Sequence, residues 1–456
     1  MSPDRLRPLV AALEAGLLER AAAARLALLA ALAGEHVLLI GPPGTAKSEL
    51  ARRLHRVFDG ARYFERLLTR FSTPEELFGP LSLKALEDDR YERLVDGYLP
   101  TAGIAFLDEV FKANSAILNA LLTLLNEREF DNGSARRRTP LVCVVGATNE
   151  VPSEEALMAF HDRFLVRVPV AAVSDDAFAA LLTLQPPAPA TVTPITAAER
   201  AAIAAGRDAV RLDVPVIEAL RALRAEAAAQ GIVVSDRRWR QLVGLLRTAA
   251  LTEGRDHVDT LDLWLVPYAV AAQPAHVAAL QAWFVRELAQ AAPADAPWLT
   301  RAVEAFEKQL ELEARAPGDE TDDAAGKLAL ARSVGGAGDA SMLRIVSGTL
   351  EAALRKRYSP VHVDARLAQV DALRAQIRAP AEALRGQRDA LAQALAGRLW
   401  LPPALAQQML AALDATRAVL DALLARLDAV HAGFAALPRD DTLRDAAAPA
   451  PVALSA

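Results

Sequence analysis

One short glycine loop constrains this chain more than any other feature: the run Gly41-Pro42-Pro43-Gly44-Thr45-Ala46-Lys47-Ser48. It follows the apolar run 36–40, which predicts a strand, and it precedes a helical pattern from Glu49 to Phe58. In this order, backbone N–H groups and the helix N-terminus can bind phosphate, and the lysine can reach the β- and γ-phosphates. The sequence therefore predicts a P-loop for a nucleoside triphosphate.

Two positions of this loop carry further expectations. Ser48 follows the lysine, and its hydroxyl can hold Mg²⁺. Ala46 stands where the general pattern G-x-x-x-x-G-K-[ST] has its second glycine. Alanine costs little there if its φ angle is negative, so this departure does not argue against a P-loop.

The bulk properties exclude several classes of protein. A net charge of −6 argues against a general electrostatic grip on DNA or on anionic membranes. Cys143 is the only cysteine, which excludes a disulfide framework and favours a buried strand thiol in a reducing cytosol. No signal peptide is expected at the N-terminus, and the uncharged stretch 263–285 contains prolines and polar residues, so it predicts buried helices rather than a transmembrane segment.

Alternating strand and helix patterns continue from the P-loop to Val170 and predict an α/β fold, a mostly parallel sheet with helices on both faces. Two further apolar runs end in polar residues, one at Asp108-Glu109 and one at Asn149. Ligands gather at the carboxyl ends of such strands. We therefore expect the P-loop, the two carboxylates and the asparagine to meet there.

Several local patterns predict individual elements of this core. They are a helix over 6–33 stopped by Gly34, a short strand over 61–68, a helix start at Ser72-Thr73-Pro74, a mixed polar insertion over 79–100, and a hairpin turn at Asn132-Gly133. Thr196 and Glu199 predict a capping box that opens a helix.

The chain divides into five predicted parts. They are an α/β nucleotide-binding domain at 1–184, a proline-rich linker at 185–195, an all-α lid at 196–292, a helical C-terminal region at 293–438, and a disordered tail at 439–456. Apolar residues recur every seven positions within 363–437 and predict an antiparallel helical hairpin. Packing within the chain is favoured for this hairpin, and a partner-binding coil remains open.

The polar strand ends suggest hydrolysis. Asp108 can hold Mg²⁺ through its waters, and Glu109 can polarise the water that attacks the γ-phosphate. Asn149 can hydrogen-bond that water or a γ-phosphate oxygen. A strand that ends in Asp-Glu beside a P-loop therefore predicts a nucleotide hydrolase.

These motifs together resemble those of a known family. The stretches 41–48, 106–109, 147–150 and 162–164 resemble the Walker A, Walker B, sensor 1 and arginine-finger elements of AAA+ ATPases of the MoxR family. The stretches 69–82 and 90–100 resemble its RavA subfamily in particular. The similarity is dense from Leu6 to Val170 and thins in the lid.

The resemblance implies ATP and Mg²⁺ as cofactors and assigns roles to particular residues. Catalytic roles fall to Lys47, Glu109, Asn149 and Arg163, metal binding falls to Ser48 and Asp108, and nucleotide binding falls to Gly41, Pro43, Gly44, Thr45, Ala46, Lys47, Ser48, Glu49, Leu17, Leu18 and Arg237. Leu17 and Leu18, in the helix ahead of the P-loop, would pack the adenine ring. Arg163 would act on a neighbouring subunit, with Arg128 as its rival, and Arg237 would be the sensor 2 residue, with Arg238 as the alternative.

The resemblance also implies an assembly and a function. It implies a hexameric ring, with the helix-2 insertion at 81–100 and the hairpin at 130–138 facing its pore. The leading hypothesis is a cytoplasmic, chaperone-like ATPase that remodels or activates a client protein with a von Willebrand factor A (vWA) domain partner. The C-terminal region shows no strand alternation, so binding of a decarboxylase, as in RavA proteins, is not expected. A slow nucleotide-gated scaffold, a nucleic-acid motor and a metal-chelatase subunit remain alternatives, although no stable nucleic-acid binding is expected.

Overall fold

The computed structural model describes residues 2–152, 154–185, 192–287, 297–316, 355–443 and 447–453. The chain separates into two compact units. Unit 1 comprises residues 1–289 and 393–409, and unit 2 comprises residues 290–392 and 410–456. Parts of the predicted linker (186–191), of the C-terminal region (317–354) and of the tail (444–446 and 454–456) lie outside the described residues.

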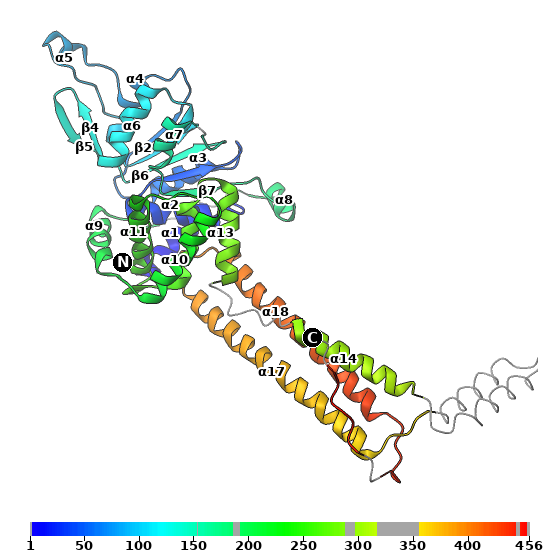
Figure 1. Cartoon of the computed structure of the whole chain (residues 1–456). Coiled ribbons are helices and arrows are strands. Elements are labelled where there is room, and N and C mark those ends of the chain that lie inside the picture. The colour runs from blue at the N-terminus through cyan, green and yellow to red at the C-terminus, as the bar shows by residue number, and fades with distance from the viewer. Residues whose placement is uncertain are drawn as a thin grey trace, which may run out of the picture. The chain divides into compact units, whose positions relative to one another are not determined.

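Unit 1 is built on a parallel five-stranded sheet in the order β2-β3-β6-β1-β7 (Figure 1). Its strands are β1 (Val37–Ile40), β2 (Tyr63–Leu67), β3 (Ile104–Asp108), β6 (Cys143–Thr148) and β7 (Val166–Pro169). All four residues of β1 and all six of β6 are buried, as expected for central parallel strands covered on both faces. The predicted α/β fold and the short strand within 61–68 are confirmed.

Helices cover both faces of this sheet. The helices of this α/β domain are α1 (Pro3–Glu14), α2 (Ala21–Ala33), α3 (Lys47–Arg56), α4 (Pro74–Phe78), α5 (Leu83–Glu87), α6 (Ser115–Glu127), α7 (Glu155–His161) and α8 (Asp175–Leu182), of which α5 and α8 project away from the sheet (Figure 1). Leu38 and Ile40 share one buried cluster with Leu121 of α6, so the alternate residues of β1 face the other way, where α2 packs. The single helix predicted over 6–33 is wrong, because the chain breaks between α1 and α2 at Gly16 and Glu19, whose φ angles are +68° and +57°. Gly34 does end α2, in the left-handed conformation.

The insertion and the hairpin are joined to each other. The hairpin strands β4 (Glu129–Asn132) and β5 (Ala135–Arg138) pair antiparallel around Gly133, as the Asn-Gly turn predicted. Buried Asn132 accepts a hydrogen bond from the Arg93 N–H at 2.7 Å and donates one to the Arg93 carbonyl at 3.1 Å. The insertion and the hairpin therefore hold each other at the outer edge of the sheet.

The lid region is helical, with α9 (Ala197–Gly206), α10 (Val214–Ala229), α11 (Asp236–Thr252), α12 (Val266–Val270) and α13 (Pro274–Glu287). The capping box of Thr196 and Glu199 is present at the start of α9. The short parallel pair β8 (Arg211–Leu212) and β9 (His257–Val258) was not expected from the helical patterns. It ties the start of α10 to the segment that follows α11.

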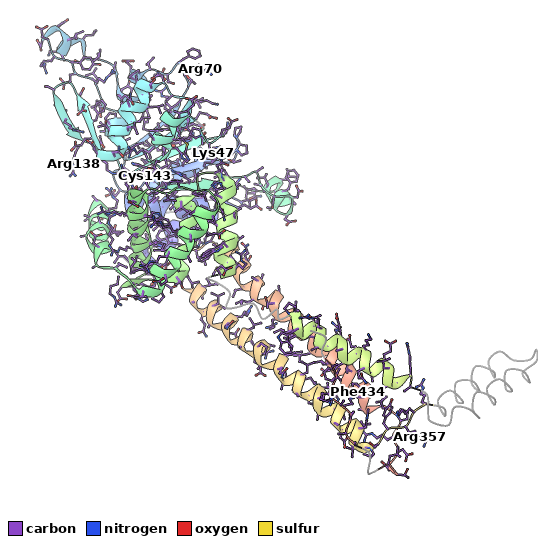
Figure 2. The ribbon with its side chains drawn as sticks, in the orientation of Figure 1. Lys47, Arg70, Arg138, Cys143, Arg357 and Phe434 are labelled. Atoms are coloured by element: carbon purple, nitrogen blue, oxygen red, sulfur yellow. The ribbon has the colours of Figure 1, made fainter. Side chains whose placement is uncertain are left out.

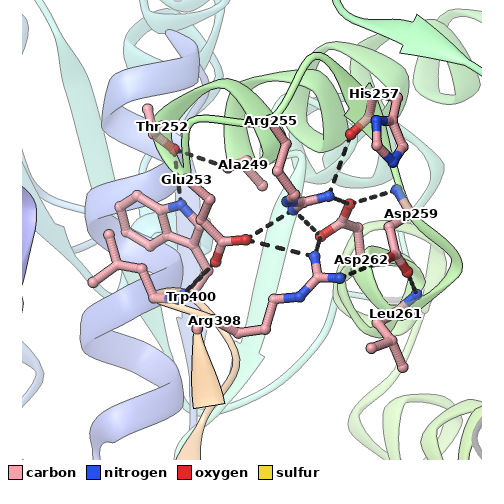
Figure 3. A network of polar contacts seen from close by, with 12 residues as sticks. Ala249, Thr252, Glu253, Arg255, His257, Asp259, Leu261, Asp262, Arg398 and Trp400 are labelled. Atoms are coloured by element: carbon pink, nitrogen blue, oxygen red, sulfur yellow. Dashed lines mark hydrogen bonds and ion pairs between the residues drawn. The ribbon is translucent and has the colours of Figure 1, made fainter. Parts of the chain in front are cut away.

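Residues 393–409, the turn between α17 (Pro360–Ala396) and α18 (Pro403–Ala435), belong to unit 1. Trp400 is 1% exposed, and its indole N–H donates to Thr252 at 2.8 Å. Beside it, Arg398 and Arg255 share the buried carboxylates of Asp262 and Glu253, as Figure 3 shows. This network fastens the turn to the end of α11 and to the 3₁₀ helix η4 (Thr260–Leu265).

In unit 2, α14 (Pro297–Ala314) shares one hydrophobic core with α17 and α18. The heptad residues of both long helices lie in this core, including Val370, Leu420 and Phe434, which is labelled in Figure 2. Packing within the chain, the favoured interpretation of the heptads, is therefore confirmed. The predicted tail belongs to unit 2, where Arg366 of α17 donates to the Ala450 carbonyl at 2.8 Å. No helix in the described part of the chain is long and apolar enough to cross a membrane.

Candidate functional site

The P-loop lies between the end of β1 and the first turn of α3. Gly41 is required there by space, because a Cβ at this position would meet the Val170 carbonyl oxygen at 1.9 Å. Gly44 is required by conformation, with a φ of +80°. Ala46 does not meet the condition of a negative φ: its φ is +64°, so this alanine occupies a left-handed position that favours glycine.

Lys47 is the one charged residue of the loop 41–48, and it is buried, with 8% of its surface exposed. Its ammonium donates to the carbonyl oxygens of Gly41 at 2.7 Å and Pro42 at 2.8 Å. Burial lowers its pKa, and the nearby carboxylates of Asp108 and Glu109 oppose that shift. The lysine of the P-loop and the two carboxylates are thus close enough to interact, as the sequence predicted.

The carboxylates follow β3 at the same edge of the sheet as the P-loop. Glu109 has a φ of +52°, a strained left-handed conformation for a residue with a side chain. Its carboxylate accepts a hydrogen bond from the Asn149 amide at 2.6 Å and pairs with Lys112 at 3.2 Å. The backbone N–H of Glu109 donates to the Asp108 carboxylate at 3.0 Å, which orients that side chain.

The fit of this edge to a magnesium nucleotide rests on the loop itself. No side chain caps the N-terminus of α3, so the N–H groups of its first turn are available to bind phosphate. In the described part of the chain, no group of three or more His, Cys, Asp or Glu could hold a metal. A cation here would therefore depend on Ser48, Asp108 and the phosphates of the nucleotide.

Sequence reasoning missed one residue that supports the loop. Arg20 is buried, and its guanidinium donates to the Thr45 carbonyl at 3.2 Å and to the Ala171 carbonyl at 2.6 Å. It thereby connects the P-loop to the segment after β7. Its only sequence signal is that Glu19-Arg20 is a charged pair within an otherwise apolar run.

Leu17, Leu18 and Glu49, three further predicted nucleotide contacts, lie in different settings. Leu17 and Leu18 are half-buried in the break between α1 and α2, not in a helix as predicted. The reason is the pair of positive φ angles at Gly16 and Glu19 that flanks them. Glu49 pairs with Arg53 at 2.8 Å, one turn further along α3.

The opposite edge of the sheet, where the strands begin, holds the candidate arginines. Arg163 lies three residues before β7, and its Nε is buried with no partner among the described residues. Burial lowers its pKa, and the neighbouring charge of Arg237 lowers it further. Arg128, the rival of Arg163, donates instead to three backbone carbonyls, those of Leu141, Val142 and Gly34. The guanidinium of Arg128 therefore stabilises the fold, whereas the Nε of Arg163 makes no such hydrogen bond.

The two candidate sensor 2 residues differ in the same way. Arg238 is 3% exposed, pairs with Asp162 at 2.9 Å, and donates to the carbonyls of Phe164 and Leu165. Arg237 makes one hydrogen bond, to Asn126 at 2.9 Å, at the surface. Both lie at the edge where the strands begin, whereas Lys47 of the same chain lies at the edge where they end. Arg237 is thus placed with Arg163 and away from its own P-loop.

Cys143 is fully buried at the start of β6, and burial raises its pKa to about 12 (Figure 2). A thiol in this state is not a nucleophile, as the sequence predicted.

The sheet order, the P-loop and the helical lid define a P-loop ATPase of the AAA+ class, and comparison with known proteins agrees. Residues 4–191 match the model described as "MoxR domain in the MoxR-vWA-beta-propeller ternary systems", and residues 215–284 match an AAA lid domain. The chain belongs to the MoxR family of AAA+ ATPases. These matches do not single out the RavA subfamily, which stays a prediction.

The chain resembles several individual proteins. Two uncharacterised proteins of Methanocaldococcus jannaschii are 42% identical over 250 and 248 residues, 54% of this chain in each case. These matches span 66% and 64% of the relatives' own length, slightly less than two thirds. Protein MoxR of Paracoccus denitrificans is 31% identical over 173 residues, 36% of this chain and 50% of that protein. A crystal structure of a putative ATPase from Cytophaga hutchinsonii, 18% identical with a TM-score of 0.48, covers 59% of this chain and 86% of its own, a level that supports no further conclusion.

Proposed function

We propose that this chain is one subunit of a ring, most simply a hexamer, that hydrolyses ATP to remodel or activate a client protein. Membership of the MoxR family supports an ATPase with a chaperone-like role. The description of the matching family model names vWA and β-propeller proteins, which supports a vWA-domain adaptor as a partner. A cytoplasmic location stays part of this proposal.

The observation that carries the proposal is the separation of the two halves of the site. Lys47, Asp108 and Glu109 lie where the strands end, and Arg163 lies where they begin. The buried Nε of Arg163 has no hydrogen-bond partner among the described residues, and no other charged side chain in that part of the chain forms an ion pair with Arg163. An arginine suited to stabilise phosphoryl transfer can meet the P-loop only if a second copy brings it there.

Each residue at the P-loop edge has a defined role in this proposal. Ser48 and Asp108 would hold Mg²⁺, which neutralises charge on the phosphates when it is bound. Lys47 contributes a fixed positive charge beside the loop. Glu109 orients and polarises the attacking water once its carboxylate leaves Asn149, and Asn149 then holds that water or a phosphate oxygen. The Asn149 amide donates to the Glu109 carboxylate at 2.6 Å, so in this arrangement it keeps Glu109 from the water. Once it turns to the water or to a phosphate oxygen, the same amide supports hydrolysis.

The insertion offers a surface for a client. Its side chains Leu83, Leu86, Tyr91 and Leu94 are exposed by 50–75%. Apolar groups gathered on one projecting element are typical of protein-binding surfaces. Because Asn132 ties the insertion to the β4–β5 hairpin, we expect both to move together with the nucleotide state.

The contacts of the basic run Arg136-Arg137-Arg138 disfavour the nucleic-acid alternative. Arg136 pairs with Glu127, Glu129 and Asp131, and Arg137 lies 3.7 Å from Glu92. Most of this positive charge is therefore neutralised within the chain, which leaves little for a phosphate backbone. The slow scaffold and the chelatase subunit find no specific support in these contacts.

Subunit mixing tests the proposal directly. Glu109→Gln should bind ATP and fail to hydrolyse it, and Arg163→Ala should also be inactive. A mixed ring contains interfaces in which an intact P-loop edge from the Arg163→Ala chain meets an intact Arg163 from the Glu109→Gln chain. At a one-to-one ratio, random mixing should restore roughly a quarter of wild-type ATPase activity, because a head-to-tail contact pairs unlike faces.

A control mixture shows whether recovery needs two different halves of the site. Glu109→Gln mixed with Lys47→Ala should recover nothing, since both changes affect the same half of the site. Unchanged turnover in Arg163→Ala alone, or no recovery in the first mixture at concentrations where the wild type is assembled, would contradict the role of Arg163 between subunits.

A further inference from the structure

Helix α8 is an apolar element that no other described part of unit 1 buries. None of its residues is buried, and Phe178, Leu181 and Leu182 are 52%, 41% and 71% exposed. Figure 1 shows α8 standing away from the sheet and the lid of unit 1. A short helix that exposes this much apolar surface is more stable when another surface covers it.

A matching surface lies on the lid, at the loop between α10 and α11. A pocket of about 270 Å³ opens there between Ala227, Ile232, Val233 and Trp239. Val233 is 97% exposed, and the indole N–H of Trp239 is buried with no partner among the described residues. The pocket is lined mostly by apolar side chains and is of a size to take one aromatic ring.

The charges of the two surfaces are also complementary. Asp175 and Asp176 occupy the first turn of α8, and neither has an ion pair with another described residue. Arg224 lines the lid pocket and likewise has no ion pair in the described part of the chain. Opposite charges beside matching apolar groups give a contact both affinity and register.

The helix cannot reach the pocket of its own chain. Helix α8 follows the end of β7 and is held beside the P-loop, because Glu19 accepts hydrogen bonds from Ser174 while Arg20 joins Thr45 to Ala171. The pocket adjoins the start of α11, where Arg238 contacts Phe164 and Leu165 ahead of β7. The two surfaces therefore lie at opposite ends of one strand.

We infer that α8 docks into the α10–α11 pocket of a second copy of this chain, with Phe178 as the anchor. The inference rests on the proposed ring and deepens it. Such a contact is head-to-tail, and each copy offers one helix and one pocket. It would also align the composite site: α8 borders the P-loop of one copy, and the pocket adjoins Arg237, which lies near Arg163, in the next. The contact thus holds the site's two halves in register.

Sedimentation velocity with a non-hydrolysable ATP analogue, together with the concentration dependence of ATPase activity, tests this contact. Phe178→Asp should raise the protein concentration for half-maximal specific activity about tenfold or more, because a charge replaces a buried ring. Leu312→Asp is the matched control, the same change at another exposed apolar residue (60% exposed), and it should behave as the wild type does. Equal assembly of the Phe178→Asp and Leu312→Asp variants overturns the inference.

Charge reversal provides a second, independent measurement. Arg224→Glu should weaken assembly several-fold, and the triple variant with Asp175→Arg and Asp176→Arg should restore most of it. Absence of rescue, with circular dichroism showing all variants folded, also counts against the contact. If the wild type stays monomeric with nucleotide, the proposed ring itself fails. If the wild type assembles and the α8 variants assemble equally well, only the docking of α8 fails.

Discussion

The two edges of the sheet in unit 1 use charged residues in opposite ways. Where the strands end, Lys47, Asp108 and Glu109 form few contacts, and these are contacts that a nucleotide can replace. Where the strands begin, Arg128 and Arg238 use their guanidinium groups on backbone carbonyls and are fixed. At that edge Arg163 and Arg200 both have a buried Nε without a hydrogen-bond partner among the described residues, and Arg163 is the one that lies directly ahead of β7. The comparison teaches that hydrogen-bond saturation, more than residue type, separates a functional charge from a structural one.

The largest effect should come from a substitution at the P-loop edge, where the strands end. Glu109→Gln should lower ATPase activity about 10³-fold, because the carboxylate that polarises water is lost. ATP binding, measured by calorimetry, and the unfolding midpoint should change little, since the amide oxygen of the substituted side chain can still accept the Asn149 hydrogen bond. A large drop in the unfolding midpoint would show that Glu109 stabilises the fold as the arginines of the opposite edge do.

The P-loop edge could be predicted because its chemistry follows local patterns. The order of strand, loop and helix placed Lys47, and the polar strand ends placed Asp108, Glu109 and Asn149, once parallel strands were assumed. Its details could not be predicted, because the positive φ angle of Ala46 and the break at Gly16 depend on packing rather than on residue preference.

The opposite edge was harder to predict for a physical reason. Arg128, Arg163, Arg237 and Arg238 look alike in sequence, and their roles depend on which carbonyls the fold brings near them. Arg238 meets Phe164 and Leu165 across 73 or 74 positions of sequence, a separation that no local pattern encodes. The network of Arg398 with Asp262 spans 136 positions and was missed for the same reason (Figure 3).

Two adjacent arginines test whether the hydrogen bonds at the edge where the strands begin stabilise the fold. Arg238→Ala should reduce the free energy of unfolding by about 3 kcal/mol, because it leaves buried carbonyls without donors. Arg237→Ala, one residue away at the surface, should change it by less than about 0.5 kcal/mol. Urea unfolding followed by tryptophan fluorescence would measure both, since Trp239 and Trp264 report on the lid. Equal losses in the two variants would remove the distinction between them.

Glu35, at the edge where the strands begin, should make the stability of the fold depend on pH. It lies just before β1, where burial raises its pKa to about 7 against the opposing charges of Arg128 and Arg207. Its folded pKa is above its unfolded value near 4.3, so the stability it contributes is complete below that value and is lost as pH rises through about 7. Between pH 5 and 8, the wild type should therefore lose about 2–3 kcal/mol more stability than Glu35→Gln. Parallel stability curves for the two proteins across this range would contradict the shift.

The smallest effect should come from an exposed ion pair at the P-loop edge. Lys112 is 62% exposed and lies 3.2 Å from the Glu109 carboxylate, so the pair is worth only about 0.2–1 kcal/mol. Since this contact helps to hold Glu109 against Asn149, Lys112→Ala should free the carboxylate and raise ATPase activity by about fivefold at most. Lys308→Ala, a surface change in unit 2, is the control and should leave the activity as it is. A tenfold fall in Lys112→Ala would instead place Lys112 among the groups that hydrolysis needs, and the contacts of this edge would no longer be replaceable.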